Sequence, residues 1–283
     1  MSRSVFERIA ESLVVRGVKT ALKRIFGSRS ESSPEDVPLP THREANKVHP
    51  WRLCGQGRHW VTKHPLKVPV SAKNPDGQTI RDGHCADNPR RGKKPVHDYM
   101  DRHEIDAIAR NQFFNMQGTP RLGALTEFEG SEKYDPYIQG WTRYWNEVLK
   151  PKIPLDPNVI KALIASESSF ELMPTPQKAG KAGWARGLIQ LTDQAIGALG
   201  NVRGEIKDHY IKISPEETTD TNMSICSGIR WLFQKQKLAS GDLGREATWV
   251  EAVEKYKGIL NKNEQKKQKE LGQFYEKYKK LSR

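Results

Sequence analysis

Cysteine is scarce in this sequence, and long apolar runs are missing from it. Only Cys54, Cys85 and Cys226 occur among 283 residues, too few for a disulfide-rich scaffold. Their odd number leaves at least one thiol unpaired within a monomer. No segment approaches the roughly 18 to 20 apolar residues of a membrane-spanning helix, and the first residues lack the apolar core of a secretory signal. We therefore expect a protein made in the cytoplasm, which would reach other compartments only by a route without a standard signal peptide.

Acidic residues are outnumbered, since 47 Lys and Arg stand against 34 Asp and Glu, for a net charge of +13. Ten basic and three acidic residues between Lys255 and Arg283 supply +7 of that excess. Such a balance indicates a polyanionic partner, either nucleic acid, acidic lipid or an anionic cell-wall polymer. The basic run at 90–94 (Arg-Arg-Gly-Lys-Lys) favours a nucleic-acid-binding protein as one alternative. No helix-turn-helix, zinc-finger or RNA-binding signature accompanies it, so we expect no specific nucleic-acid partner.

Composition and periodicity divide the chain into four segments. Residues 1–27 have the spacing of a basic amphipathic helix, which would lie on a membrane surface, on a partner or on the protein itself. Residues 28–48, rich in Ser, Pro, Glu and Asp, predict a linker. Short β-like runs and many histidines between 49 and 115 predict a small irregular module, and residues 116–283 have helical periodicity throughout. The sequence thus predicts a mainly α protein with an all-α second half.

The module at 49–115 brings cysteine and histidine together. Cys54, His59, His84 and Cys85 include the residue types that zinc prefers, but no Cys-x-x-Cys pair is present. The same residues are equally compatible with surface positions or with a disulfide between Cys54 and Cys85. We therefore expect no metal in this module and keep the four residues only as weak zinc candidates.

A glutamate continues the apolar stripe of one predicted helix. Asp156 and Pro157 are a strong helix start, because Asp caps free backbone amides and proline at the first position loses no hydrogen bond. On the helix that follows, to about residue 170, Glu167 comes three residues after Ile164 and four after Leu163, and so continues their apolar stripe. Burial there would raise the pKa of the carboxyl, as a general acid requires. The alternative is that Glu167, near the helix end, reaches solvent.

Helical spacing recurs on both sides of that segment. Aromatic and apolar residues at four-residue intervals predict one helix, and a second apolar face among lysines predicts a C-terminal helix that docks on the domain with its basic face outward. The alternative for the second helix is a dedicated polymer-binding element. The first set is Tyr137, Trp141, Trp145 and Leu149, and the second is Leu271, Phe274, Tyr275, Tyr278 and Leu281.

Four motifs, in order, resemble those of soluble lytic transglycosylases. Glu-Ser-Ser-Phe at 167–170 resembles the catalytic Glu-Ser of that family, and Gly-Leu-Ile-Gln at 187–190 resembles its Gly-Leu-Met-Gln. The segment 219–232 is similar to a family helix that carries an Asn and a Gly before an aromatic-Leu pair. Ala-Val-Glu-Lys-Tyr-Lys-Gly at 252–258 resembles Ala-x-x-x-Tyr-Asn-Gly, with Lys257 in place of Asn. The resemblance covers about residues 135–262.

The resemblance implies a lysozyme-like domain over 116–283 that cleaves peptidoglycan between N-acetylmuramic acid and N-acetylglucosamine. Glu167 would be the catalytic acid, and no cofactor is implied. Glycines at 180, 183 and 187 would form an open loop for a bulky sugar. The residues expected to bind substrate or orient the acid are Ser168, Gly187, Gln190, Asn222 and Tyr256. The segment between Glu167 and Gly187 is longer than usual in the family, which puts the substrate preference in doubt.

The reaction product depends on a second carboxylate. Hydrolysis by two carboxyl groups needs an Asp or Glu across the scissile bond, and Asp193 is the nearest candidate. Goose-type lysozymes, which resemble this family, carry an aspartate where this sequence has Thr192, one residue earlier. We therefore expect a single-acid reaction with a 1,6-anhydro product, with hydrolysis by a muramidase as the alternative.

The expected partner is peptidoglycan. Residues 59–89 vaguely resemble short modules near interbacterial or phage-associated effectors, which favours an antibacterial effector or a phage-type lysin. Such a protein would act in the periplasm or cell wall and would have a secretion-system component or an immunity protein as a further partner. A catalytically inactive wall-binding domain is another alternative.

Overall fold

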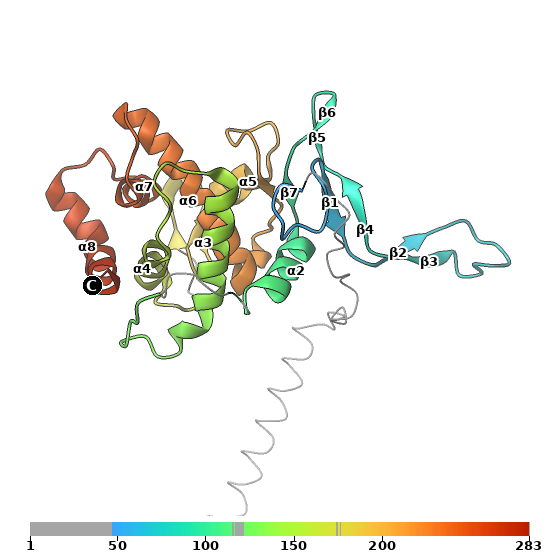
Figure 1. Cartoon of the computed structure of the whole chain (residues 1–283), viewed down its shortest axis with the longest axis horizontal. Helices are drawn as coiled ribbons and strands as arrows, with labels where there is room; N and C mark the ends of the chain where they lie inside the picture. The colour runs from blue at the N-terminus through green and yellow to red at the C-terminus, as the bar shows by residue number, and fades with distance from the viewer. Residues whose placement is uncertain (1–46, 115, 117–121, 174, 176, 283) are drawn as a thin grey trace, which may run out of the picture. The chain divides into compact units, whose positions relative to one another are not determined.

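The computed structural model describes residues 47–114, 116, 122–173, 175 and 177–282 (Figure 1). The helix expected at 1–27 and nearly all of the linker expected at 28–48 lie outside these residues. Within them the protein is mainly α, as predicted. The helices are α2 (Arg102–Gln112), α3 (Asp135–Leu149), α4 (Pro157–Ser168), α5 (Asp193–Gly200), α6 (Thr221–Leu243), α7 (Trp249–Tyr256) and α8 (Glu264–Leu281).

Side-chain caps set the beginnings of several helices. Asp156 accepts a hydrogen bond of 2.9 Å from the amide of Asn158, as the helix start in the sequence predicts. Thr248 and Glu251 form a reciprocal capping box at α7. These caps satisfy amides that the first helical turn leaves without partners. None of the described helices is long and apolar enough to cross a membrane.

Helix α6 is the central element of the core. It packs against α2, α3 and α7, and its side chains from Asn222 to Gln234 are all buried. A helix surrounded on all sides must be apolar around most of its circumference. The predicted stripe on α3 is confirmed, because Trp141 and Trp145 are fully buried against this helix.

The C-terminal helix α8 docks on α4, as expected (Figure 1). Leu271, Phe274 and Leu281 are buried in the main core. Two lysines of the same helix, Lys277 and Lys280, both form ion pairs with Glu127, at 2.8 and 2.9 Å. Part of the basic face is therefore engaged within the protein.

The all-α expectation for the second half was wrong at two places. The strands β8 (Gln177–Lys178), β9 (Trp184–Arg186) and β10 (Leu191–Thr192) form a three-stranded antiparallel sheet. A further short strand, β11 (Tyr210–Ile211), pairs with a strand that lies before residue 116, outside the segment that was expected to be helical. Strands of two or three residues show no alternation long enough to distinguish them from loops.

Between Arg58 and Pro95 the chain forms short two-stranded ribbons, as the β-like runs predicted. The strand β1 (Arg58–Val61) pairs with β4 (His84–Asp87), β2 (His64–Lys67) with β3 (Gln78–Arg81), and β5 (Arg90–Arg91) with β6 (Lys94–Pro95). The basic run at 90–94 is the exposed tip of the last ribbon. A turn at 74–77 lies between β2 and β3, and Gly77 there has a φ of 62°.

The boundary predicted near residue 115 does not separate two cores. The strand β7 (Tyr99–Met100) pairs in parallel with β11 of the helical segment. Side chains of β7 and α2, including Met100 and Ile105, belong to the same core as α3 and α6. The residues that the structure describes accordingly belong to one compact unit. Helix α2 was not predicted, since an irregular module was expected over 49–115, and periodicity cannot show which core an apolar face joins.

A buried ionic network fixes the ribbon segment to α2. Arg52, 1% exposed, donates to both carboxylate oxygens of Glu104 at 2.6 and 3.0 Å and pairs with Asp98. Glu104 also accepts the amides of Leu53 and Trp60, each at 3.2 Å. Buried charges are tolerated only when such partners replace water.

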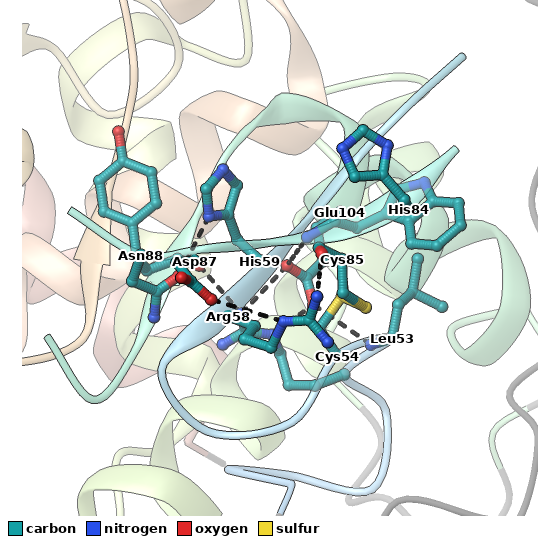
Figure 2. The surroundings of a disulfide bond; sticks show 12 residues. Leu53, Cys54, Arg58, His59, His84, Cys85, Asp87, Asn88 and Glu104 are labelled. Carbon is teal, nitrogen blue, oxygen red and sulfur yellow. Dashed lines mark hydrogen bonds and ion pairs between the residues drawn. A yellow bond between two sulfur atoms is a disulfide. The ribbon is translucent and has the colours of Figure 1, made fainter. Parts of the chain in front are cut away.

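The weak zinc candidates of this segment do not form a metal site. Cys54 and Cys85 are joined in a disulfide, with Cα atoms 5.8 Å apart (Figure 2). His59 contacts Asn88 and His84 contacts the carbonyl of Asp82. The disulfide alternative is therefore the one that the structure bears out, because two sulfurs bonded to each other offer no thiolate to a metal.

The disulfide closes a loop of 31 residues. Chain entropy predicts that opening a loop of this size lowers the free energy of unfolding by about 3 to 4 kcal/mol. We expect this loss in the double variant Cys54→Ala, Cys85→Ala, measured by urea unfolding. Cys226→Ala serves as a control for the number of thiols. Equal stability of the wild-type protein with and without reductant would contradict the assignment.

Candidate active site

Glu167 lies one residue before the end of α4, and its side chain is only 7% exposed. The alternative that it reaches solvent is therefore wrong. The preceding residues of the stripe, Ile160, Leu163 and Ile164, are fully buried. The helix turns the carboxyl to the same side as these side chains because residues three and four apart share a face.

Lys257 pairs with this carboxyl. Its Nζ lies 2.6 Å from Glu167 Oε1, and its side chain is 29% exposed. Lys257 is the residue after α7, where the resemblance leads one to expect Asn. Burial raises the pKa of Glu167 above its ordinary value, and the Lys257 ammonium opposes that rise. The pKa of Glu167 is raised on balance, because desolvation is the larger of the two effects.

The residues immediately after Glu167 have strained backbones. Ser169 and Phe170 have φ values of 52° and 63°, in the left-handed region that favours glycine. Phe170 is buried and stacks on Tyr134, whose hydroxyl donates to the Phe170 carbonyl at 3.1 Å. Two successive residues in this conformation persist only where surrounding packing holds them, a property frequent at functional sites.

Ser168 binds backbone, not an open surface. Its buried hydroxyl lies 3.2 Å from the carbonyl of Ile164 and donates at 2.8 Å to that of Leu188. The sequence analysis placed Ser168 among the substrate-binding residues. In the structure it instead joins the end of α4 to the turn between β9 and β10.

That turn, residues 187–190, is also held by two helices and by one hydrogen bond of its own. Ser224 of α6 accepts the amide of Leu188 at 3.1 Å. Tyr256 of α7 donates to the carbonyl of Ile189 at 2.5 Å. Gln190, itself buried with a φ of 55°, donates to the carbonyl of Gly187 at 2.9 Å. Gln190 and Tyr256 thus position the backbone of the turn. The pKa of the Tyr256 hydroxyl is raised mainly by burial and further by the negative charge of Glu167.

Two of the three glycines expected to form an open loop, Gly183 and Gly187, serve close packing instead, whereas a Cβ at Gly180 would meet nothing within 4 Å. Gly187 has a φ of 73°, and a Cβ there would lie 2.2 Å from the carbonyl oxygen of Thr218. A Cβ at Gly183 would lie 2.3 Å from the carboxylate of Asp193. Only glycine allows these approaches.

Asp193 and Asn222 are occupied elsewhere. Asp193 accepts the amide of Trp184 at 2.8 Å and pairs with Arg186, and these contacts keep its pKa below the ordinary value. Asn222 accepts from Trp141 at 2.7 Å and donates to the Ile105 carbonyl and to Asp106. No hydrogen bond or ion pair among the described residues joins either side chain to Glu167.

The structure therefore brings together Glu167, Lys257 and the turn at 187–190, with Ser168 and Tyr256 as supports. Sequence reasoning missed Lys257 as a functional residue. The sequence did carry a signal that this position is unusual, because Lys257 stands where the resembling motif has Asn. One buried carboxyl with a raised pKa is suited to donate a proton and to accept one afterwards.

Comparisons with protein-family models, with curated proteins and with solved structures find no match to this chain.

Replacing Gly187 tests whether the turn is a packing element. We expect Gly187→Ala to lower the free energy of unfolding by at least about 2 kcal/mol, because the left-handed backbone alone costs about 1 to 2 kcal/mol with a Cβ. Gly197→Ala in α5 is the matched control, since a Cβ there meets nothing within 4 Å. Urea unfolding of both variants measures the difference. Similar stabilities would show that the turn is loosely held.

Glu167→Gln tests the raised pKa through stability. The folded protein holds this carboxyl with a pKa above its unfolded value, so the wild-type protein loses stability as pH rises through the folded pKa. Gln carries no charge to bury. We expect the variant to have a higher Tm than the wild type near pH 7, and the gap to close on acidification towards pH 4. A pH-independent gap would argue against a raised pKa.

Proposed function

We propose that this protein cleaves the glycan strand of peptidoglycan between N-acetylmuramic acid and N-acetylglucosamine, with Glu167 as the acid. The observation that carries the proposal is the buried Glu167 carboxyl at the end of α4, whose pKa burial raises. The motifs that resemble soluble lytic transglycosylases meet around it, since Ser168, residues 187–190 and Tyr256 are joined by hydrogen bonds. A lysozyme-like domain is the fold that this arrangement favours.

A single carboxyl accounts for a non-hydrolytic reaction. Protonated Glu167 donates its proton to the glycosidic oxygen as the bond to the muramic acid C1 breaks. The resulting carboxylate then takes the proton of the same sugar's 6-hydroxyl, whose oxygen bonds to C1 and closes the 1,6-anhydro ring. The acid regains its proton, and no water is consumed.

Asp193 supports this choice over hydrolysis. A two-carboxyl mechanism needs a carboxylate that can activate a water or form a bond to the sugar. Asp193 instead binds Arg186 and the Trp184 amide, which reduces its basicity. A muramidase reaction remains the alternative if Asp193 leaves these partners.

Lys257 would act on Glu167 through charge. Its ammonium pairs with the ionised carboxyl, the form that exists after proton donation. Lys257 is partly exposed and follows the last helical residue of α7, so it can turn towards solvent when the acid regains its proton. The excess of positive charge on the chain would concentrate anionic wall material in a salt-dependent way.

The proposed place of action is the periplasm or cell wall. Disulfides persist mainly in oxidising compartments, and the Cys54–Cys85 bond supports this placement. An antibacterial effector with a secretion-system component and an immunity protein as partners, or a phage-type lysin, fits such a placement.

Loss of the acid tests the activity. We expect Glu167→Gln to slow clearing of purified peptidoglycan suspensions by about 10²- to 10⁴-fold, the usual contribution of a general acid. Glu171→Gln, at an exposed carboxylate four residues later, is the matched control and should clear the suspension at the wild-type rate. Clearing by folded Glu167→Gln at the wild-type rate would remove Glu167 from the mechanism. No clearing by the wild type would leave a wall-binding domain.

A further inference from the structure

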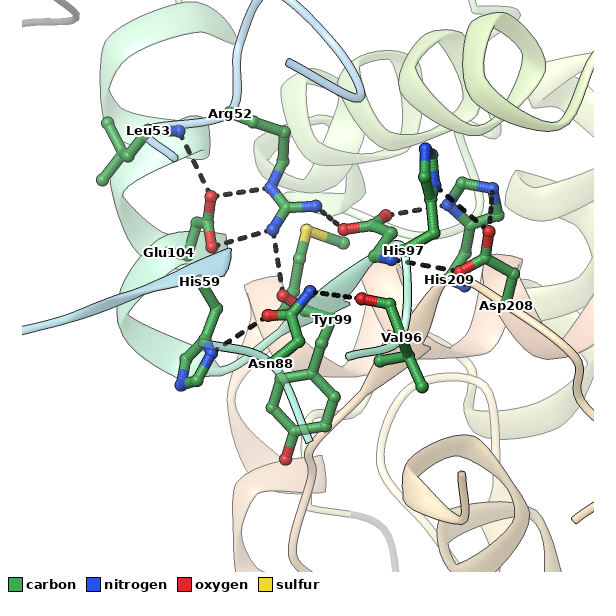
Figure 3. Close-up of polar contacts among 12 residues, drawn as sticks. Arg52, Leu53, His59, Asn88, Val96, His97, Tyr99, Glu104, Asp208 and His209 are labelled. Carbon is green, nitrogen blue, oxygen red and sulfur yellow. Dashed lines mark hydrogen bonds and ion pairs between the residues drawn. The ribbon is translucent and has the colours of Figure 1, made fainter. Parts of the chain in front are cut away.

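Two histidines and an aspartate gather where β7 joins the helical segment (Figure 3). His97 precedes β7, and Asp208 and His209 immediately precede β11, its parallel partner. One ligand atom from each residue lies within 4.8 Å of the others. His97 is more than a hundred positions away from the other two residues in the chain, and no motif in the sequence pointed to the three.

The carboxylate of Asp208 is oriented by the backbone. Its Oδ1 accepts two amides, from Asp98 at 3.1 Å and from His209 at 2.8 Å. The other oxygen, Oδ2, faces the two rings, 3.2 Å from Nδ1 of His97 and 3.7 Å from Nε2 of His209. One oxygen is thus anchored and the other is presented to the histidines.

The His209 ring is oriented by a buried carboxylate. Its Nδ1 lies 2.8 Å from Oδ2 of Asp98, and Asp98 is 1% exposed and paired with Arg52. A carboxylate only accepts, so Nδ1 carries the proton and Nε2 keeps a lone pair on the side of Asp208. A carboxylate behind a histidine in this way is the usual outer shell of a metal-binding imidazole.

The backbone at this point is strained and externally held. His209 has a φ of 57°, which a non-glycine residue rarely adopts. The buried guanidinium of Arg230 donates to the carbonyls of Asp208 and His209, at 2.8 and 2.9 Å. Strain kept in place by a dedicated buried side chain is frequent at ligand sites.

We propose that His97, Asp208 and His209 form a binding site for a divalent transition metal ion, with zinc as the best fit. Two ligands of one tetrahedral zinc at bond lengths of 2.0 to 2.2 Å lie about 3.3 Å apart, close to the two measured contacts. Two imidazoles and one carboxylate suit zinc and its neighbours in the first transition row. Three protein ligands would leave a fourth position for water.

The surrounding charge permits a cation. The guanidiniums of Arg52 and Arg230 are set against the carboxylates of Asp98, Glu104 and Asp208. Arg52 is occupied by two of these carboxylates and Arg230 by main-chain carbonyls. Bound metal would tie the residue before β7 to the residues before β11, and so join the ribbon segment to the helical segment.

The test is zinc binding by the tag-free, oxidised full-length chain, freed of metal by chelator. We expect calorimetry with zinc chloride to show one ion per chain and zinc to raise the Tm. His97→Ala should weaken binding at least about tenfold, as loss even of an outer-shell partner does, and should abolish the rise in Tm. The His97 side chain is 45% exposed, so its removal should leave the fold intact without zinc.

His103→Ala, at an exposed histidine of α2, is the matched control and should bind zinc as the wild type does. Unchanged zinc affinity in His97→Ala would place the ion elsewhere, for instance at the neighbouring rings of His64 and His84, and would overturn the proposal. Absence of saturable binding to the wild type would also overturn it, and would leave the cluster as a set of ion pairs.

Discussion

Desolvation of one carboxyl group is the constraint around which the candidate site is built. Glu167 occupies the position of a core residue on α4, and an ionised carboxylate in such a place loses the water that would stabilise its charge. Among the described residues, the cation that pairs with it is Lys257, at 2.6 Å. Burial and this ion pair act on the pKa in opposite directions, and burial prevails. The balance yields a carboxyl that keeps its proton to a higher pH than an exposed glutamate does.

The groups around Glu167 act mainly on backbone. Ser168 and Tyr256 donate to carbonyls of the turn at 187–190, and Ser224 accepts an amide from it. Residues that a motif comparison assigns to substrate thus hold α4, α6 and α7 in register around one turn. Such support is what fixes a catalytic group to within a fraction of an ångström. It also explains why the glycine at 187 cannot carry a side chain.

The sequence predicted the features that are local in the chain. The cap at Asp156, the stripe that buries Glu167 and the apolar face of α8 all follow from helical periodicity and elementary capping chemistry. The strands β8 to β11 were not predictable, because they are too short to alternate. Contacts between distant segments were equally hidden, including the Lys257 pair and the cluster at His97, Asp208 and His209. From the sequence, the disulfide was one of several possible roles for Cys54 and Cys85. The structure shows how the two cysteines meet, because β4, which contains Cys85, pairs with β1, the strand that follows Cys54.

The central claim is that one buried acid cleaves the glycan without a second carboxylate. The most direct measurement is mass spectrometry of the soluble products after the wild-type protein digests purified peptidoglycan. Single-acid cleavage predicts muropeptides that are lighter by one water molecule than the products of hydrolysis, with an anhydro ring at the muramic acid end. Muropeptides with reducing ends, or no soluble muropeptides at all, would contradict it.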